Sequence, residues 1–553
     1  MNLPLSAHSR LSSSRIRSAV ICGLGLAFPA SLALAQTSGT WTSITGGNWS
    51  DIANWSSGAG PVATGGSTGA NVTATFSATG TQTVNLDTNQ TVQTIAFSNG
   101  TYTLSSSNGS VLTLAGTTTP IIASTGTISA TLAGTQGFTM NPGGSRTLTL
   151  SGNNTYSGVT TLTNGNITIR SNNALGSTGA GNGTVVTQAS GAFPQLHIAN
   201  NVTTSEDITL RMNQTGAAAG SLVGSNLLYN DGGTNSLNGT LVLDRTGSAS
   251  TNHIHWFGVQ ITGAGSIVNL NGAISGAATA GQASGTYADP TRLQFRATTA
   301  TSVANVSGAI SNGTLTTGGL SVYTATDNLG IVRLSGDNTY TGSTVHQKGS
   351  LLINNTTGSG TGTGAVSVAS TAVFGGTGFV KPTGTNGITF ASGAIVAPGD
   401  LTDSGSAIAA GKTLTFDLGS TTGTALFDTG STISINMNAA APLPADVSER
   451  LAFIGLTTGV SQVTFNSNVV NFSVTGGLLA DGVYTLASFS ADNAYTGQWV
   501  LGTGLESYSN VQLIQNANSI QLSIGAIPEP STYAAFAGLI ALGVVIVRQR
   551  RRS

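Results

Sequence analysis

The sequence predicts an all-β protein in which short strands stack into a solenoid, and three observations support this prediction. Only 7% of the 553 residues are charged, against about 25% in an average soluble domain, so amphipathic helices with a charged face are excluded. Gly occupies 76 positions, and Thr, Ser and Asn fill much of the rest, a composition that suits strands and turns. The hydrophobic fraction of 39% and the net charge of −1 argue against a disordered chain.

Apolar and polar residues alternate in short runs along the whole chain. A period of two places the apolar residues of a strand on one face, which is then buried. Gly, Asn and Ser clusters separate the runs and permit the chain to reverse direction. We expect one turn of the solenoid, called a coil below, to take roughly 20–25 residues. The clearest runs are Thr83–Leu86, Thr94–Phe97, Thr101–Leu104, Leu241–Leu243, Ile267–Leu270 and Ile520–Ile524.

One longer pattern occurs twice, beginning at Leu150 and at Leu334. The first copy reads LSGNNTYSGVTTLTNGNITI and the second reads LSGDNTYTGSTVHQKGSLLI. A second strand is expected after each copy, at Thr184–Thr187 and at Ala365–Val368. A single unit cannot bury its apolar face alone, whereas stacking on a neighbouring unit does so. The repeated units therefore span 150–190 and 334–375.

This pattern resembles the autotransporter-associated β-strand repeat, with its Leu-x-Gly-x-Asn-Thr-Tyr-x-Gly-x-Thr core. Asn493–Gly497 repeats a fragment of it. The resemblance implies a right-handed parallel β-helix. The chain departs from autotransporters at its end, because Arg548–Ser553 stand where those proteins close a β-barrel translocator.

The N-terminus has the features of a secretory signal peptide over residues 1–35. Arg10, Arg15 and Arg17 precede the apolar stretch Ala19–Leu34. Ala33-Leu34-Ala35 forms an A-x-A cleavage site, so cleavage is expected between Ala35 and Gln36. Cys22, the only cysteine, lies within this leader, and the mature chain would therefore contain no thiol or disulfide.

The C-terminal residues 526–553 carry a motif, an apolar stretch and a basic cluster. The stretch Ala534–Val547 would form a transmembrane helix of about 21 Å, which is short against roughly 30 Å of hydrocarbon. Arg548, Arg550, Arg551 and Arg552 follow it and should remain cytoplasmic, with the body of the chain across the membrane.

Pro528, Glu529 and Pro530, followed by Ser-Thr-Tyr, resemble the PEP-CTERM sorting signal. The resemblance implies an exosortase-type sorting peptidase as a partner, and a host that makes exopolysaccharide. It predicts a protein that is exported, anchored in the membrane through its C-terminus, and then placed at the cell surface or released after processing. A plain C-terminal membrane anchor remains the alternative.

Between these ends we expect three regions. Residues 36–140 form an N-terminal β-rich capping region that includes Trp41, Trp49 and Trp55. Residues 141–440 form the β-solenoid, and residues 441–525 form a C-terminal β-rich cap with a short helix at Pro444–Arg450. Caps are expected because an open solenoid end exposes an edge prone to aggregation.

Residues with catalytic or metal-binding chemistry are few. His253 and His255 lie two apart on a strand, but no third ligand is evident, so surface histidines beside an aromatic patch are expected. Glu206 and Asp207 are neighbours that would face opposite sides of a strand. No cluster of Lys and Arg is evident in the body. No catalytic residue, metal, cofactor or nucleic-acid partner is therefore expected.

The leading hypothesis is a non-enzymatic structural or interaction protein of the cell surface or extracellular matrix, which contacts exopolysaccharide or other surface proteins. The alternative is an adhesin or carbohydrate-binding surface protein, for which exposed aromatics at Trp256-Phe257 or at Trp41, Trp49 and Trp55 would argue. A glycan-active enzyme is the third hypothesis, because polysaccharide lyases also use parallel β-helices.

Overall fold

The computed structural model describes most of the chain between residues 38 and 525. The described ranges are 38–56, 72–116, 119, 121–123, 125–142, 144–189, 191–213, 222–245, 254–278, 291–315, 319–401, 412–419, 422–441 and 447–525. Within these ranges the chain forms β-strands and one short 3-10 helix, Ile52–Asn54, with no α-helix. None of the described residues belongs to a helix with the length and apolarity needed to cross a membrane.

The longest sheet, called sheet B, is parallel and joins each strand to the next in chain order. It supplies the outward face discussed below. Its strands are β2 (Gly47–Asn48), β4 (Thr81–Asn85), β7 (Thr101–Ser105), β10 (Gly126–Ile128), β13 (Thr147–Leu150), β15 (Asn166–Ile169), β17 (Gln195–Ile198), β20 (Leu222–Asn230), β23 (Ile254–Ile261), β26 (Thr291–Ala297), β29 (Leu320–Thr324), β31 (Thr344–His346), β33 (Val366–Val368), β36 (Ile388–Phe390), β39 (Ala425–Phe427), β42 (Val463–Phe465) and β45 (Tyr495–Thr496).

Sheet A is the second long parallel sheet, and it covers the N-terminal and middle coils. Its strands are β1 (Gly39–Trp41), β3 (Thr73–Phe76), β6 (Thr94–Phe97), β9 (Ile121–Ala123), β12 (Thr139–Met140), β14 (Val159–Leu162), β16 (Gly183–Ala189), β19 (Ile208–Asn213), β22 (Leu241–Asp244), β25 (Ile274–Ala277) and β28 (Ile310–Ser311).

Sheet D is the third long parallel sheet, and it covers the middle and C-terminal coils. Its strands are β18 (Thr203–Thr204), β21 (Thr234–Leu237), β24 (Ile267–Leu270), β27 (Val303–Val306), β30 (Ile331–Leu334), β32 (Ser350–Ile353), β34 (Val373–Gly376), β37 (Ile395–Pro398), β40 (Thr432–Asn438), β43 (Asn468–Thr475) and β46 (Trp499–Leu501).

Two smaller sheets complete the coils at either end of the described chain. Sheet C is parallel and contains β5 (Gln90–Val92), β8 (Val111–Leu114) and β11 (Thr131–Ala133). Sheet E contains β35 (Phe379–Val380), β38 (Thr413–Asp417), β41 (Arg450–Ile454), β44 (Gly482–Phe489), β47 (Gln512–Gln515) and β48 (Ser519–Ile524). Its last pairs, β44 with β48 and β48 with β47, are antiparallel.

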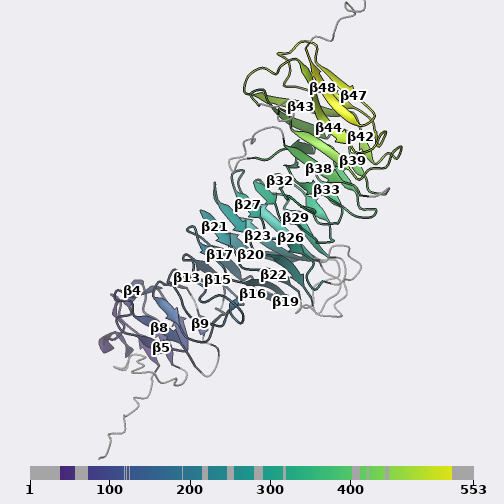
Figure 1. Cartoon of the computed structure of the whole chain (residues 1–553). Coiled ribbons are helices and arrows are strands. Elements are labelled where there is room, and N and C mark those ends of the chain that lie inside the picture. Colours follow the sequence, from purple (N-terminus) through teal and green to yellow (C-terminus); the bar gives the residue numbers. More distant parts are fainter. Residues whose placement is uncertain are drawn as a thin grey trace, which may run out of the picture. The chain divides into compact units, whose positions relative to one another are not determined.

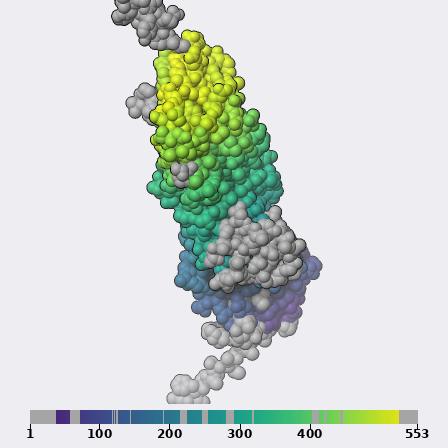
Figure 2. All heavy atoms as spheres, turned by 90° about the vertical axis from the view of Figure 1, so that its right-hand side faces the viewer, coloured from purple at the N-terminus to yellow at the C-terminus, as the bar shows by residue number. Residues whose placement is uncertain are grey.

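The chain visits these sheets in rotation, as a parallel β-helix requires. In the middle region β20, β21 and β22 lie in sheets B, D and A, and β23, β24 and β25 repeat that order one coil later (Figure 1). The colours of the space-filling view likewise follow the sequence from blue through teal and green to yellow (Figure 2). The prediction of an all-β chain with long parallel sheets is confirmed over the described residues, and the described strands between residues 200 and 330 belong to the same sheets as their neighbours.

The expected coil length is wrong for the middle region. Leu148 pairs with Ile167 on β15, which corresponds to a short coil, whereas His255 pairs with Thr291 on β26, 36 residues further along. The extra length lies partly in longer strands, because β20 and β23 have 9 and 8 residues where β13 has 4. Longer strands widen sheet B at this point.

The core lies between the sheets and follows the predicted alternation. Along β26 the side chains of Thr291, Leu293 and Phe295 are buried, and those between them are partly exposed. In the C-terminal coils, two ladders of phenylalanines stack in register, with ring centroids 4.7 to 5.2 Å apart, and each such pair contributes about 1 kcal/mol. The ladders are Phe390, Phe427 and Phe465 in sheet B, and Phe416, Phe453 and Phe489 in sheet E.

The N-terminal tryptophans form the start of this core. Trp41 and Trp49 each contact Trp55 at a centroid distance of 5.1 Å in edge-to-face geometry. Phe76 packs against all three rings. The indole N–H of Trp55 donates to the carbonyl of Trp49 at 2.8 Å, so its polar group is satisfied inside the cluster. The three rings are buried and close the first coil.

The two repeat copies use their shared residues to join coils. Asn154 Oδ1 accepts from the Leu132 amide at 2.8 Å, and its Nδ2 donates to the Ala174 carbonyl at 2.6 Å. Asn338 makes the equivalent pair with Ile310 and Gly360 at the same distances. Each asparagine therefore bridges three successive coils. Tyr156 and Tyr340 are buried, and the hydroxyls of each pair with Thr160 and Thr344.

Most of the expected strands are confirmed within one or two residues. Thr83–Leu86 corresponds to β4, Ile267–Leu270 to β24, and Ile520–Ile524 to β48. The helix expected at Pro444–Arg450 is wrong over its described part. Ser448 forms an antiparallel bridge with Met437, and Arg450 begins β41, because backbone pairing with the neighbouring coils satisfies these residues instead.

Gly497 lies at a tight contact with a neighbouring coil, and its replacement is predicted to lower the free energy of unfolding. Gly497 and Gly459 both have positive φ, +79° and +75°. A Cβ at Gly497 would overlap the Phe465 carbonyl, whereas one at Gly459 meets nothing within 4 Å. We expect Gly497→Ala to lower the free energy of unfolding by about 2 kcal/mol and Gly459→Ala by only about 1 kcal/mol. Urea unfolding checks this, and equal losses would contradict the overlap.

Candidate functional site

The outward face of sheet B brings together polar and aromatic side chains from several neighbouring strands. Between β17 and β31 the core-facing positions are mostly apolar, with exceptions such as His255, Thr291, Thr324 and His346, and the positions between them point away from the core. Register pairs place His197, Tyr229, Gln260 and Arg296 in one row across four strands. The outward side chains of neighbouring coils are therefore adjacent, about 4.8 Å from strand to strand.

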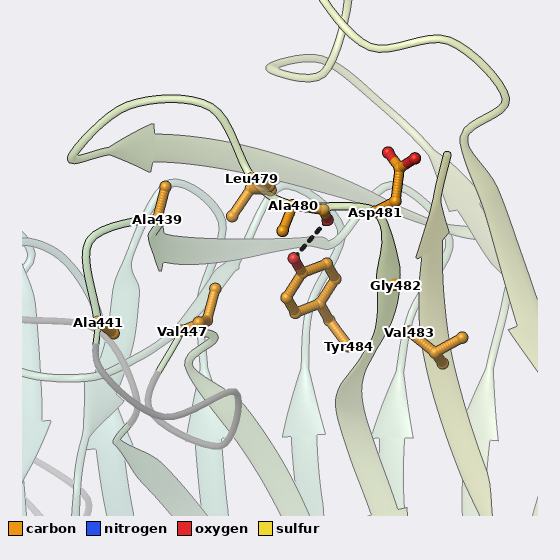
Figure 3. Close-up of a pocket in the computed structure, with 9 residues that line it drawn as sticks. All are labelled: Ala439, Ala441, Val447, Leu479, Ala480, Asp481, Gly482, Val483 and Tyr484. Carbon is orange, nitrogen blue, oxygen red and sulfur yellow. Dashed lines mark hydrogen bonds between the residues drawn. The ribbon is translucent and has the colours of Figure 1, made fainter. Parts of the chain in front are cut away.

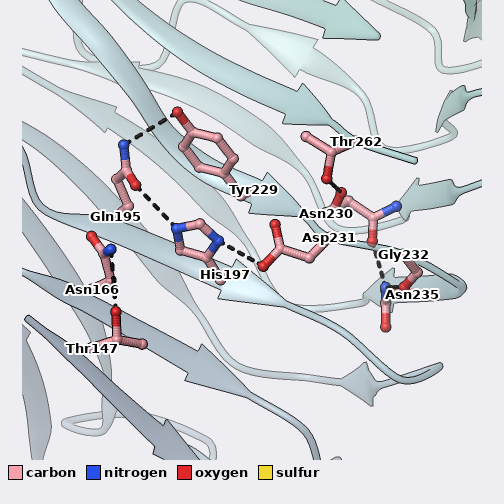
Figure 4. Close-up of polar contacts among 10 residues, drawn as sticks. All are labelled: Thr147, Asn166, Gln195, His197, Tyr229, Asn230, Asp231, Gly232, Asn235 and Thr262. Carbon is pink, nitrogen blue, oxygen red and sulfur yellow. Dashed lines mark hydrogen bonds and ion pairs between the residues drawn. The ribbon is translucent and has the colours of Figure 1, made fainter. Parts of the chain in front are cut away.

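One end of this row is a hydrogen-bonded cluster around His197 (Figure 4). The His197 ring stacks on Tyr229, with centroids 4.6 Å apart. His197 Nδ1 lies 2.7 Å from Asp231 Oδ2, and Nε2 lies 3.1 Å from Gln195 Oε1. Gln195 Nε2 donates to the Tyr229 hydroxyl at 3.2 Å. These contacts fix the orientation of both rings. The polar groups of the cluster hydrogen-bond one another.

Trp256, further along the same face, lies flat against the sheet. Its register partner is Gly224, and Gly258 follows two residues later on the same face. A Cβ at Gly224 would stand 2.7 Å from the indole Cδ1, and one at Gly258 would stand 2.9 Å from Cζ3. The indole, together with Asn226 at Gly258, therefore occupies the space that side chains at both glycines would fill. One ring face contacts the sheet, and the other faces away from it.

Arg292 and Arg296 on β26 lie beside this indole. The Arg292 guanidinium carbon lies 4.2 Å from the centroid of the Tyr323 ring, a cation–π contact. Arg292 Nε is buried without a hydrogen-bond partner in the described part of the chain. Arg292 pairs in register with Trp256, so its cationic head and the indole belong to neighbouring strands.

Arg296 is held by other side chains. It contacts Asp327 through two nitrogens, with Nη2 2.6 Å from Oδ2, and its Nη1 donates to Gln260 Oε1 at 3.0 Å. Hydrogen bonds from this guanidinium hold the pKa of Asp327 below its usual range. Gln260 Oε1 also accepts from Asn226 Nδ2 at 2.6 Å. Arg296 and Asp327 neutralise each other, which leaves Arg292 as the excess charge.

These residues line a cavity of about 550 Å³, within the usual range for small-molecule sites. Its walls come from four strands and from the turn after β29. They supply one flat indole, one phenol ring, two guanidinium groups, amide side chains and one carboxylate. The lining residues are Asn226, Trp256, Arg292, Gln294, Arg296, Tyr323, Thr324, Ala325, Thr326, Asp327 and Gln347. We call this cavity the sheet-B groove.

A second cavity, of about 430 Å³, lies near the end of the described chain (Figure 3). Its lining is mostly apolar, from Ala439, Val447 and Leu479 among others. The Tyr484 hydroxyl points inward but donates to the Ala480 carbonyl at 2.6 Å. Asp481 is its only charged lining residue. This cavity offers little that would orient a polar ligand.

Glu206, Glu449 and His346 are buried titratable residues, and His346 Nδ1 lies 2.9 Å from the hydroxyl of Thr324, which lines the groove. Burial raises the pKa of Glu206 to about 7 and that of Glu449 to about 8. Burial lowers the pKa of His346 to about 4, although Nε2 lies 2.9 Å from the Val373 carbonyl. Glu206 accepts from Thr184 at 2.8 Å. The three groups hydrogen-bond backbone or side-chain partners, whereas Glu206 Oε2 and Glu449 Oε1 are buried without a partner in the described part of the chain.

The sequence-predicted sorting and cleavage residues lie outside the described residues. These are Ala35, Gln36, Pro528, Glu529, Pro530, Arg548, Arg550, Arg551 and Arg552. His253 also lies outside them. No group of three His, Cys, Asp or Glu side chains in the described ranges is arranged to hold a metal ion.

Several sequence-based expectations about aromatics and charges need correction. Trp41, Trp49 and Trp55 are core residues and do not supply the exposed aromatics that would favour the carbohydrate-binding alternative, whereas in the other pair Phe257 is buried and Trp256 faces outward. His255 is buried rather than on the surface, because it faces the core side of β23. The expectation of no arginine cluster is wrong, since Arg292 and Arg296 share the outward face of β26.

Sequence reasoning missed most of the groove because its members are far apart in the chain. Trp256, Arg292 and Tyr323 come from three coils of unequal length, and only the register brings them together. One local signal was available. Arg292, Gln294 and Arg296 are spaced by two, which on a strand puts all three on one face.

Compared with known proteins, the chain matches no protein-family model. No curated protein matches its sequence either. Function is therefore inferred from the residues and their geometry.

Proposed function

We propose that the protein is an exported, non-enzymatic structural or interaction protein of the cell surface or extracellular matrix, which displays a right-handed parallel β-helix. The observation that carries this proposal is the long stack of parallel sheets with polar side chains on their outward faces. Parallel strand connections are right-handed in about 98% of cases, which supports the handedness. Delivery would use residues 1–35, and sorting would use residues 526–553.

The outward faces support a display role because their side chains form ladders between coils. On sheet D, Asn269 donates to Ser236 at 3.0 Å and Asn305 donates to Asn269 at 2.9 Å. Asn271 donates to Asn238 at 2.9 Å in the same way. Such ladders hold side chains at a fixed spacing along the stack. A regularly spaced polar surface suits contact with a repeating partner such as exopolysaccharide or a surface protein.

Substitution of the motif tests the sorting part of the proposal. We expect the wild-type protein in the host at the surface or in the medium, without its basic tail. With Pro528→Ala and Glu529→Ala together, the protein should remain in the inner membrane and keep Arg548–Arg552. Exosortase-type recognition of the motif is the reason. Ser531→Ala serves as the control. Identical fractionation of the double variant and the wild type would contradict processed sorting and favour a plain anchor.

A carbohydrate-binding surface protein is the second candidate function, and the sheet-B groove favours it. A flat exposed aromatic beside amide and guanidinium donors is suited to a ring that has both an apolar face and polar edges. The groove lining contains one carboxylate, Asp327, which is paired with Arg296. Because paired-acid hydrolysis needs two carboxyl groups facing one bond, binding without cleavage is the activity that we propose.

A further inference from the structure

We propose that the sheet-B groove binds an acidic oligosaccharide, with Trp256 as the surface on which a sugar ring stacks and Arg292 as the partner of its carboxylate. This inference rests on the second candidate function above and names its ligand class. It also predicts which substitution removes the preference for charge and which weakens the binding of charged and neutral sugars alike.

The stacking surface follows from the two glycines beneath the indole. Gly224 and Gly258 remove the side chains that would otherwise lift the Trp256 ring away from the sheet. A core aromatic would bury both faces, as Trp41 and Trp49 do at the N-terminus. Trp256 instead remains partly exposed among the groove-lining residues. An apolar sugar face can therefore lie parallel to the ring and remove apolar area from water.

The charge preference follows from the balance of ionised groups around the groove. Arg296 and Asp327 form a bidentate pair and cancel. Lys348, in the turn after β31, lies close enough to contribute to lowering the pKa of Asp327. Arg292 has no carboxylate partner among the described ion pairs, and it pairs in register with Trp256. The groove therefore has a net positive charge beside its stacking surface.

Polar side chains of the groove indicate where the ligand's oxygens would be placed. Arg292 Nε has no hydrogen-bond partner in the described part of the chain, so this guanidinium is not saturated by protein groups. A guanidinium is suited to two parallel hydrogen bonds with a carboxylate. The partly exposed amide of Gln294, which also lines the groove, would hydrogen-bond a sugar hydroxyl. A neutral sugar can use the second contact, but only an acidic sugar can satisfy the charge of Arg292.

Intrinsic fluorescence provides a direct reading of this groove. Of the five tryptophans, Trp41, Trp49, Trp55 and Trp499 are only 0%, 1%, 3% and 3% exposed. A sugar stacked on Trp256 should therefore shift the emission of the one partly exposed indole. The probes are tetramers of galacturonate, mannuronate and guluronate, the fully methyl-esterified galacturonate tetramer, and tetra-aspartate. Calorimetric titration measures the affinity of each for the wild type and the variants.

We expect at least one acidic tetramer to bind the wild type at least tenfold more tightly than the esterified tetramer, because a charge-assisted contact is lost in the ester. Arg292→Gln should remove this difference, and Arg170→Gln, an exposed arginine outside the groove, should keep it. Trp256→Ala should weaken acid and ester alike by about tenfold. Circular dichroism shows whether each variant is folded.

The possible results distinguish a failure of the acidic-sugar inference from a failure of the carbohydrate-binding function. Equal affinity for acid and ester in the wild type would overturn the role of Arg292 and leave carbohydrate binding standing. Binding of tetra-aspartate as tight as that of the best uronate would overturn the role of the sugar ring. Binding of none of the sugars would overturn both the inference and the carbohydrate-binding function, without bearing on export and surface display.

Discussion

Asn154→Ala is expected to lower the free energy of unfolding by about 4 kcal/mol, a large effect for an uncharged side chain. The side chain joins three coils, since it accepts from the Leu132 amide and donates to the Ala174 carbonyl. Alanine would leave both backbone groups buried without a partner, and each unsatisfied group costs about 1–3 kcal/mol. Urea unfolding and hydrogen exchange of the Leu132 amide measure the loss.

The preceding residue provides a matched control. Asn153 is exposed, and its Oδ1 accepts only from the Asn173 side chain, at 2.7 Å. Asn153→Ala should change the free energy of unfolding by less than about 0.5 kcal/mol. Asn338→Ala in the second repeat should match Asn154→Ala, because Asn338 makes the same two contacts. Similar small effects at all three positions would show that the repeat asparagines do not hold the coils together.

Stability should fall as the pH rises from about 5 to about 9, chiefly through Glu449. Burial raises the pKa of this carboxyl to about 8, although Oε2 accepts from the Asn436 amide and side chain at 2.9 and 2.8 Å. The folded chain therefore keeps a proton that the unfolded chain releases above its ordinary pKa of 4.5. This contribution to stability is fully present below the unfolded pKa and is lost as the pH rises to the folded pKa, by roughly 5 kcal/mol.

Glu449→Gln should remove most of this pH dependence and stabilise the protein at about pH 9, because an amide has no proton to lose. Glu206, with a pKa raised to about 7, should account for a smaller remaining slope. Glu506, which is exposed, serves as the control, and Glu506→Gln should leave the slope unchanged. Urea unfolding at several pH values is the measurement. A wild-type stability that rises over this range would contradict a buried protonated Glu449.

The sheets were predictable because their signal is local. Alternation along runs such as Ile267–Leu270 indicates one buried face, and stacking of successive coils buries many such faces together. The repeats also indicated equivalent local structure after Leu150 and Leu334, which end β13 in sheet B and β30 in sheet D. The coil length was not predictable, because nothing in the sequence distinguishes residues that extend β20 and β23 from those that form turns.

The groove was only partly predictable, since it depends on register. Trp256-Phe257 was recognised as an aromatic pair, but which ring faces outward depends on the phase of β23. The partners of Trp256 come from β20, β26 and β29, and a shift of one residue in any of these strands would turn its polar side chains inward. Burial of Trp41, Trp49 and Trp55 likewise depends on Phe76, which is distant in sequence.

The intact mass of the native protein, isolated from the surface and culture medium of its host, tests the central claim of export and display. The account predicts a chain that begins at Gln36 and ends near Pro530, without Arg548–Ser553. A full-length chain in the cytoplasm, or a chain in the inner membrane that retains its basic tail, would contradict processed sorting to the cell exterior.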